Sequence, residues 1–149
     1  MILAIDPGGA CLGWAFFDSG GVLTACGLSR TKEKTIDGRV LDHRTVLAKM
    51  AVVVDRIVCE RMTWRGRQTK SGPQDLMDLN VIAGAMGTEW VTPAEWKGHV
   101  PKDIHQPRIL KALTPEERKI VMAVGPPSLR HNAIDAVGIG LYALKRMRP

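Results

Sequence analysis

The sequence lacks the cysteine patterns that hold small secreted domains together or bind zinc. Its 149 residues include only three cysteines, Cys11, Cys26 and Cys59, which form no Cys-x-x-Cys motif and no Cys/His pair with ligand spacing. An odd number of scattered cysteines is typical of buried thiols in a reducing cytosol rather than of a disulfide framework. We therefore expect an intracellular protein without disulfides.

Long apolar runs and targeting segments are also missing. No stretch approaches the ~20 apolar residues that a membrane span needs, and the N-terminus has no basic region followed by a small-residue cleavage site. We therefore expect a soluble, cytoplasmic protein with no membrane partner. The chain contains no internal repeat, low-complexity tract or linker, which predicts a single domain over residues 1–149.

Positive charge is what the sequence has in excess. Lys and Arg number 21 against 15 Asp and Glu, a formal charge of +6, which favours an anionic partner such as nucleic acid over a basic protein with no polyanion partner. Residues 61–73 concentrate this charge around one tryptophan. Such a segment fits phosphate contacts and base stacking, or else a merely solvated surface; its candidate DNA contacts are Arg61, Trp64, Arg65, Arg67 and Lys70.

Two short apolar segments each end in a carboxylate. Residues 1–6 lead into Asp6 and a Pro-Gly-Gly turn, the pattern of a strand buried on both faces. Residues 56–60 form a second such strand ending in Glu60, and a helix predicted over residues 38–53 makes it parallel to the first. Asp6 and Glu60 then meet at one edge of the sheet. Asp6 taken alone could instead serve only to cap its turn.

The other elements follow from periodicity and turn residues. Residues 13–18 and 22–28 predict a hairpin joined by a Gly-rich turn. His43 is expected on the surface of the first helix, and His99 and His105 in a connection that lies near DNA and carries no metal-ligand pattern. The next expected elements are a helix over 74–86, a strand over 88–91 and a helix start at 92–93. A short helix over 108–113, a helix that begins at 114 and a last helix that begins near 128 complete the chain.

The last helix carries a third acid. Asp135 lies among apolar and small residues, so its carboxylate needs a partner, which could also be a backbone group or an arginine. His131 and Asn132 lie four and three residues before it and can share its helix face. A metal or catalytic site at the sheet edge would use this face.

Four motifs in register across the chain resemble the RuvC-type Holliday junction resolvases. They are Ile-Asp-Pro-Gly at residues 5–8 with Gly13-Trp14 after it, the strand ending in Glu60, Pro-x-x-Trp-Lys-Gly at 93–98, and His-Asn-x-x-Asp-Ala-x-Gly-Ile-Gly-Leu at 131–141. The short length and the third motif look more like the bacteriophage members. The resemblance implies an α/β, RNase H-like fold, a five-stranded mixed sheet with helices on both faces.

The resemblance also implies a metal site. Asp6, Glu60 and Asp135 would hold Mg²⁺, or Mn²⁺ in its place, with two ions per site and one more ligand from the last helix. The cellular members of the family have Asp or His three residues before the final Asp, where this chain has Asn132. His131 is the better ligand or general base and is our candidate, with Asn132 as the rival. The catalytic set predicted in this way is Asp6, Glu60, His131 and Asp135.

The implied activity is metal-dependent cleavage of four-way DNA junctions by paired nicks that leave 5′-phosphate and 3′-hydroxyl ends. Two symmetric cuts imply a homodimer, and residues 74–86 are the candidate seam. Lys97 joins the predicted DNA contacts. The phage-like features place the protein in the cytoplasm of a bacterium or of an infected host.

Three other functions share some of these features. Actin-like ATPases and sugar kinases also open with Asp-x-Gly at a first strand, but their second domain does not fit into 149 residues. A catalytically silent protein that binds branched DNA would explain the departure at Asn132, although three acids remain. A related nuclease with broader branched DNA or RNA substrates is the third alternative.

Overall fold

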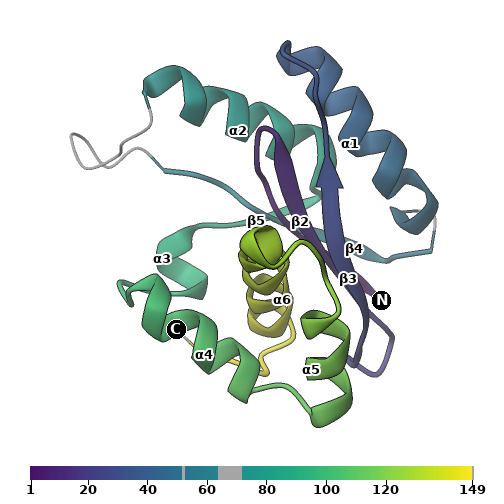
Figure 1. Cartoon of the computed structure of the whole chain (residues 1–149), viewed down its shortest axis with the longest axis vertical. Helices are drawn as coiled ribbons and strands as arrows, with labels where there is room; N and C mark the ends of the chain where they lie inside the picture. The colour runs from purple at the N-terminus through teal and green to yellow at the C-terminus, as the bar shows by residue number, and fades with distance from the viewer. Residues whose placement is uncertain (52, 64–71, 149) are drawn as a thin grey trace.

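The computed structural model describes residues 1–51, 53–63 and 72–148. It contains a five-stranded mixed sheet with the strand order β3-β2-β1-β4-β5 (Figure 1). The strands are β1 (Ile2–Asp6), β2 (Cys11–Phe17), β3 (Leu23–Arg30), β4 (Arg56–Glu60) and β5 (Glu89–Val91). The predicted sheet is therefore confirmed.

The central strand β1 brings two predicted acids to the same edge. It pairs antiparallel with β2, where Asp6 lies opposite Gly13, and parallel with β4, where Ile5 lies opposite Cys59. Parallel neighbours end at the same edge of a sheet. Asp6 and Glu60, the last residues of β1 and β4, consequently lie side by side.

Helices cover both faces of the sheet, as predicted (Figure 1). Side chains alternate along β1, so Leu3 and Ile5 pack with Leu47 and Ile82 on one face, whereas Ile2 and Ala4 belong to the core on the other. The first face is covered by α1 (Ile36–Ala51) and α2 (Pro73–Met86). The second is covered by α3 (Pro93–Trp96), α4 (Lys102–Lys111), α5 (Pro115–Met122), a 3₁₀ turn at Pro127–Leu129 and α6 (Arg130–Ala143).

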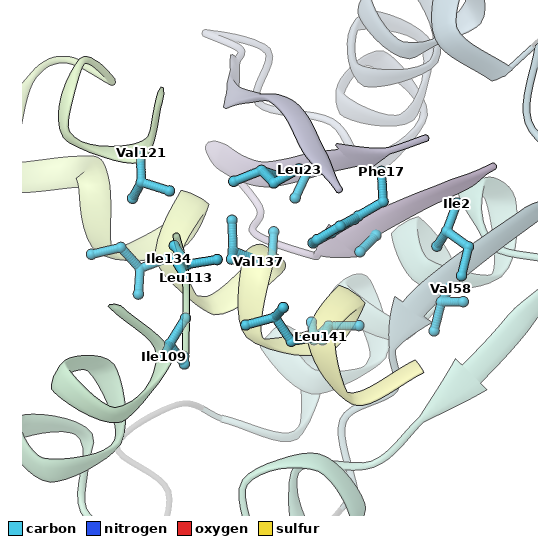
Figure 2. Close-up of a cluster of buried hydrophobic side chains, with 14 of the residues drawn as sticks. Ile2, Phe17, Leu23, Val58, Ile109, Leu113, Val121, Ile134, Val137 and Leu141 are labelled. Atoms are coloured by element: carbon cyan, nitrogen blue, oxygen red, sulfur yellow. The ribbon is translucent and has the colours of Figure 1, made fainter. Parts of the chain in front are cut away.

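Helix α6 lies in the middle of the second core (Figure 2). Its Val137 and Leu141 are fully buried in a cluster that includes Phe17 of β2. At its N-terminal end α6 lies directly on β2, since a Cβ built on Gly13 would be 2.0 Å from the backbone oxygen of Asn132. Only glycine allows this approach, which sets the start of α6 beside the residue that pairs with Asp6.

Two histidine predictions were wrong. His43 is fully buried, not exposed; its Nδ1 lies 2.8 Å from Ser29 Oγ and its Nε2 3.4 Å from Gly9 O, and these contacts satisfy the ring inside the protein. His105 does not lie in a connection, because α4 begins at Lys102 and continues through Pro107. Burial of His105 and Ile109 in the interior outweighs the helix-breaking tendency of that proline.

The last helix ends before the basic residues 145–148, which the sequence predicts as its last turn. It ends at Ala143, and Lys145 adopts a left-handed φ of 57°, which turns the basic C-terminal residues back toward the domain. Arg146 then pairs with the buried Glu117 of α5. None of the helices in the described part of the chain has the length and apolarity that a bilayer crossing requires.

Candidate active site

Three carboxylates from three separate elements meet at the end of β1. Asp6 ends β1, Glu60 ends β4 and Asp135 lies in the second turn of α6. The carboxyl group of Asp6 experiences the charges of both Glu60 and Asp135. Glu60 is 4% and Asp135 7% exposed. We call these three residues the acid cluster.

The acid cluster disfavours full ionisation. Burial raises the pKa of Asp6 well above its usual range, and the charges of Glu60 and Asp135 raise it further, while Lys97 lowers it. The negative charge confined at this edge therefore favours a cation that can offset it.

The Glu60 carboxylate is held by two consecutive residues, Trp96 and Lys97. Its Oε1 accepts a hydrogen bond from Trp96 Nε1 at 2.9 Å and lies 3.3 Å from Lys97 Nζ. Trp96 is completely buried, and the short helix α3 that carries it starts at the Thr92 cap predicted from sequence. A buried carboxylate needs such donors to remain charged.

Asp135 is held by α4. Gln106 Nε2 donates to Asp135 Oδ1 at 2.9 Å and also lies 3.3 Å from the backbone oxygen of His131. The preceding residue, His105, packs edge-on against the Trp96 ring with a centroid separation of 4.9 Å. Burial lowers the pKa of His105, whereas the charge of Asp135 raises it. In the described part of the chain, neither ring nitrogen of His105 has a hydrogen-bond partner.

The two candidates for the fourth ligand make different contacts. His131 Nδ1 lies 3.0 Å from Ser128 O, and because a carbonyl only accepts, Nδ1 carries a proton and Nε2 is the nitrogen that the neutral ring would offer to a ligand. Asn132 Nδ2 donates to Cys11 O at 3.5 Å, which turns its amide toward β2. The role of each side chain as a ligand of the acid cluster stays a prediction.

The donor chemistry of the acid cluster fits a hard divalent cation, since its carboxylate oxygens are the ligands that Mg²⁺ prefers. Within residues 1–51, 53–63 and 72–148, no group of three Asp, Glu, His or Cys side chains is already arranged to hold an ion. In the structure, donors from the protein occupy carboxylate oxygens instead: Trp96 and Lys97 contact Glu60 Oε1, and Gln106 contacts Asp135 Oδ1. Ion binding would have to displace some of these donors.

The predicted DNA contacts are placed only in part. Arg61 follows Glu60 directly, is exposed, and donates its backbone N–H to Val91 O at 2.8 Å. Lys97 lies against the acid cluster. Trp64, Arg65, Arg67 and Lys70 lie outside the described residues. The chain leading to them is fixed by Asn80 of α2, whose side chain bonds Met62 N and Met62 O, both at 3.1 Å.

Sequence reasoning missed three residues that surround the acid cluster. The sequence marks Trp96 only as part of the motif at 93–98, because its hydrogen bond to Glu60 depends on how α3 packs at the sheet edge. Gln106 and His105 fell in a stretch expected to be a connection. The proline at 107 hid the helical spacing that puts Gln106 toward α6, so the sequence offered no signal for it.

The fold is similar to that of solved RuvC structures. RuvC from Thermus thermophilus matches with a TM-score of 0.59 and 14% identity over 99% of this chain and 98% of its own. The structure of T. thermophilus RuvC in complex with a Holliday junction substrate matches with a TM-score of 0.56 and 17% identity, over 95% and 90% of the two chains. No family model and no curated protein matches the sequence. The similarity establishes the RNase H-like fold.

Proposed function

We propose that this protein is a metal-dependent endonuclease that cleaves four-way DNA junctions by paired nicks, leaving 5′-phosphate and 3′-hydroxyl ends. The observation that carries the proposal is the acid cluster: Asp6, Glu60 and Asp135, from two parallel strands and one helix, converge at one edge of the sheet. Two solved structures with a similar fold are of T. thermophilus RuvC, one of them in complex with a Holliday junction substrate. We infer a single nuclease domain of the phage-like type.

Each residue of the proposed site has a distinct task. Asp6, Glu60 and Asp135 would hold Mg²⁺ or Mn²⁺, two ions per site, and the bound ions would polarise the scissile phosphodiester and stabilise its developing charge. Trp96 and Gln106 orient Glu60 and Asp135 through their hydrogen bonds. His131 is our candidate for the remaining ligand or general base, because its Nε2 lone pair is available. Asn132 remains the rival.

Substrate binding would use the basic residues around the acid cluster. Arg61 and Lys97 flank Glu60 in the structure, and Trp64, Arg65, Arg67 and Lys70 extend the segment that begins at Arg61. Phosphate contacts supply most of the affinity of such surfaces, so binding should weaken steeply with salt.

Paired nicks require two sites related by a two-fold axis. Helix α2 is the proposed dimer seam, because Met77 is 62% and Val81 50% exposed and the two lie one turn apart on one helix face. Within the described residues, no atom lies within 4 Å of a Cβ built on the neighbouring Gly84, which would allow a second helix to approach closely.

The proposal is tested by incubating purified protein and its Asp6→Asn variant with labelled four-way junction, linear duplex and flap DNA in Mg²⁺ or Mn²⁺. We expect the wild type to cut the junction symmetrically and to leave duplex intact, and Asp6→Asn to bind but not cut. Comparison of His131→Ala with Asn132→Ala identifies the residue that completes the site. Failure to cut any branched substrate would favour the silent DNA-binding protein, and equal cutting of flaps or RNA would favour the broader nuclease.

A further inference from the structure

Lys97 places a positive charge directly on the acid cluster. Its ammonium lies 3.3 Å from Glu60 Oε1, the same oxygen that accepts the Trp96 indole N–H at 2.9 Å. The ammonium also lies over the Trp96 ring, 4.7 Å from its centroid, within cation–π range. An ion pair and a cation–π contact therefore hold this lysine at the site.

The charge of Lys97 acts in the same direction as that of a divalent ion. Glu60 and Asp135 add negative charge around Asp6, and the Lys97 ammonium, 3.3 Å from Glu60 Oε1, supplies the opposing positive charge. The lysine thus offsets part of the repulsion that would otherwise make the cluster a strong cation trap. An ammonium and a metal ion cannot share one carboxylate oxygen, because like charges at such distances repel strongly.

The surroundings of Lys97 allow it to leave. Its side chain is 32% exposed, whereas that of Glu60 is 5% exposed, so the ion pair opens toward solvent on the lysine side. Lys97 follows the end of α3 and precedes Gly98, whose φ of 63° is a left-handed conformation that glycine adopts without strain. A lysine at the mouth of a nuclease site is within the region that a DNA phosphate would enter, and phosphate is a strong alternative partner.

We propose that Lys97 is a built-in counter-ion that competes with divalent ions for Glu60 in the DNA-free protein and gives up the carboxylate when a DNA phosphate draws it away. The inference rests on the proposed function and adds a mode of regulation: the site stays poor in metal until substrate arrives. Because binding couplings are reciprocal, bound metal would raise the affinity for DNA by the same factor.

Calorimetric titration of Ca²⁺, an ion that binds carboxylate oxygens, tests the competition without requiring turnover. In the DNA-free protein, Lys97→Gln should bind Ca²⁺ at least about tenfold more tightly than the wild type, because the competing charge is gone. Lys97→Arg should stay close to the wild type. The matched control is Lys119→Gln, an exposed lysine on α5 that loses the same charge far from Glu60 in sequence.

A second titration on the protein bound to a four-way junction, checked on a gel for intact DNA, tests the release. There the difference between Lys97→Gln and the wild type should shrink below about threefold, because Lys97 has already left Glu60. Equal Ca²⁺ affinity of the DNA-free Lys97→Gln and wild-type proteins would overturn the competition, and a difference that persists on DNA would overturn the release. Titration of Asp6→Asn separates the two proposals. If Asp6→Asn binds Ca²⁺ as tightly as the wild type, or if no variant binds Ca²⁺, the metal site itself is overturned.

Discussion

The ion pair between Glu117 and Arg146 should be the strongest single electrostatic support of the fold. Arg146 Nη1 and Nη2 donate to the two carboxylate oxygens at 2.7 and 2.8 Å, and the backbone N–H groups of Leu23 and Thr114 donate to the same oxygens at 2.8 and 2.9 Å. The Glu117 side chain is 1% exposed. This network ties α5 and the residues after α6 to the start of β3, and so holds in place the helix that carries Asp135.

The magnitude follows from the pKa. The hydrogen bond with Arg146, supported by the two backbone N–H groups, lowers the pKa of Glu117 from 4.5 to about 2. At roughly 1.4 kcal/mol per pKa unit, ionised Glu117 contributes about 3 kcal/mol to stability at neutral pH. Glu117→Gln should lower the free energy of unfolding by about that amount, which corresponds to a fall of roughly 6–12 °C in Tm for a domain of this size.

The pH dependence provides the sharper test. Because the pKa of Glu117 is depressed in the folded state, its contribution is fully present above about 4.5 and is lost as the pH falls through about 2. Urea denaturation of wild type and Glu117→Gln should therefore give curves that converge between these values. Glu116→Gln, an exposed neighbour on α5, is the control. A difference below about 0.5 kcal/mol at pH 7, or one that does not change with pH, would refute the reasoning.

Two further substitutions test the packing around the acid cluster. His105→Phe should raise the free energy of unfolding by about 1–3 kcal/mol in urea denaturation, because it removes two buried ring nitrogens that have no partner in the described chain; destabilisation would mean that the imidazole nitrogens are satisfied. Gly13→Ala should cost about 1–3 kcal/mol and reduce junction cleavage, since its Cβ would meet the backbone of Asn132 and push α6 from β2. Gly84→Ala, whose Cβ would meet no atom of the described residues, should instead stabilise α2 of the single chain by about 0.5–1 kcal/mol, and equal changes in the free energy of unfolding for the two alanines would contradict the close approach at Gly13.

The sheet and the meeting of Asp6 with Glu60 could be predicted because both depend on local patterns. Each strand is a short apolar run that ends in an acid, and the helix between them imposes the parallel pairing that aligns their ends. The convergence of Asp135 required only a helix with small residues on its packing face. A Cβ on Gly138 of α6 would meet Trp96 and Ile109, and a Cβ on Gly13 of the facing strand β2 would meet the start of α6.

The donors around the acid cluster could not be predicted because they depend on tertiary packing. Gln106 reaches Asp135 from a helix that continues through Pro107, where the local propensity favours a break. The helical spacing predicts a surface position for His43, but Ser29 and Gly9, which are distant in the sequence, bring polar atoms close to its ring after folding. Local sequence encodes which residues are apolar, but not which distant polar group satisfies a buried one.

The most direct test of the central claim is single-turnover cleavage of a four-way junction by wild type and Asp6→Asn as Mg²⁺ is raised from zero, with DNA binding measured in the same samples. The acid cluster predicts paired nicks that appear only with the metal, and an Asp6→Asn variant that binds the junction with near wild-type affinity but does not cut it. Cleavage by Asp6→Asn at the wild-type rate, or metal-independent cleavage by the wild type, would contradict the account.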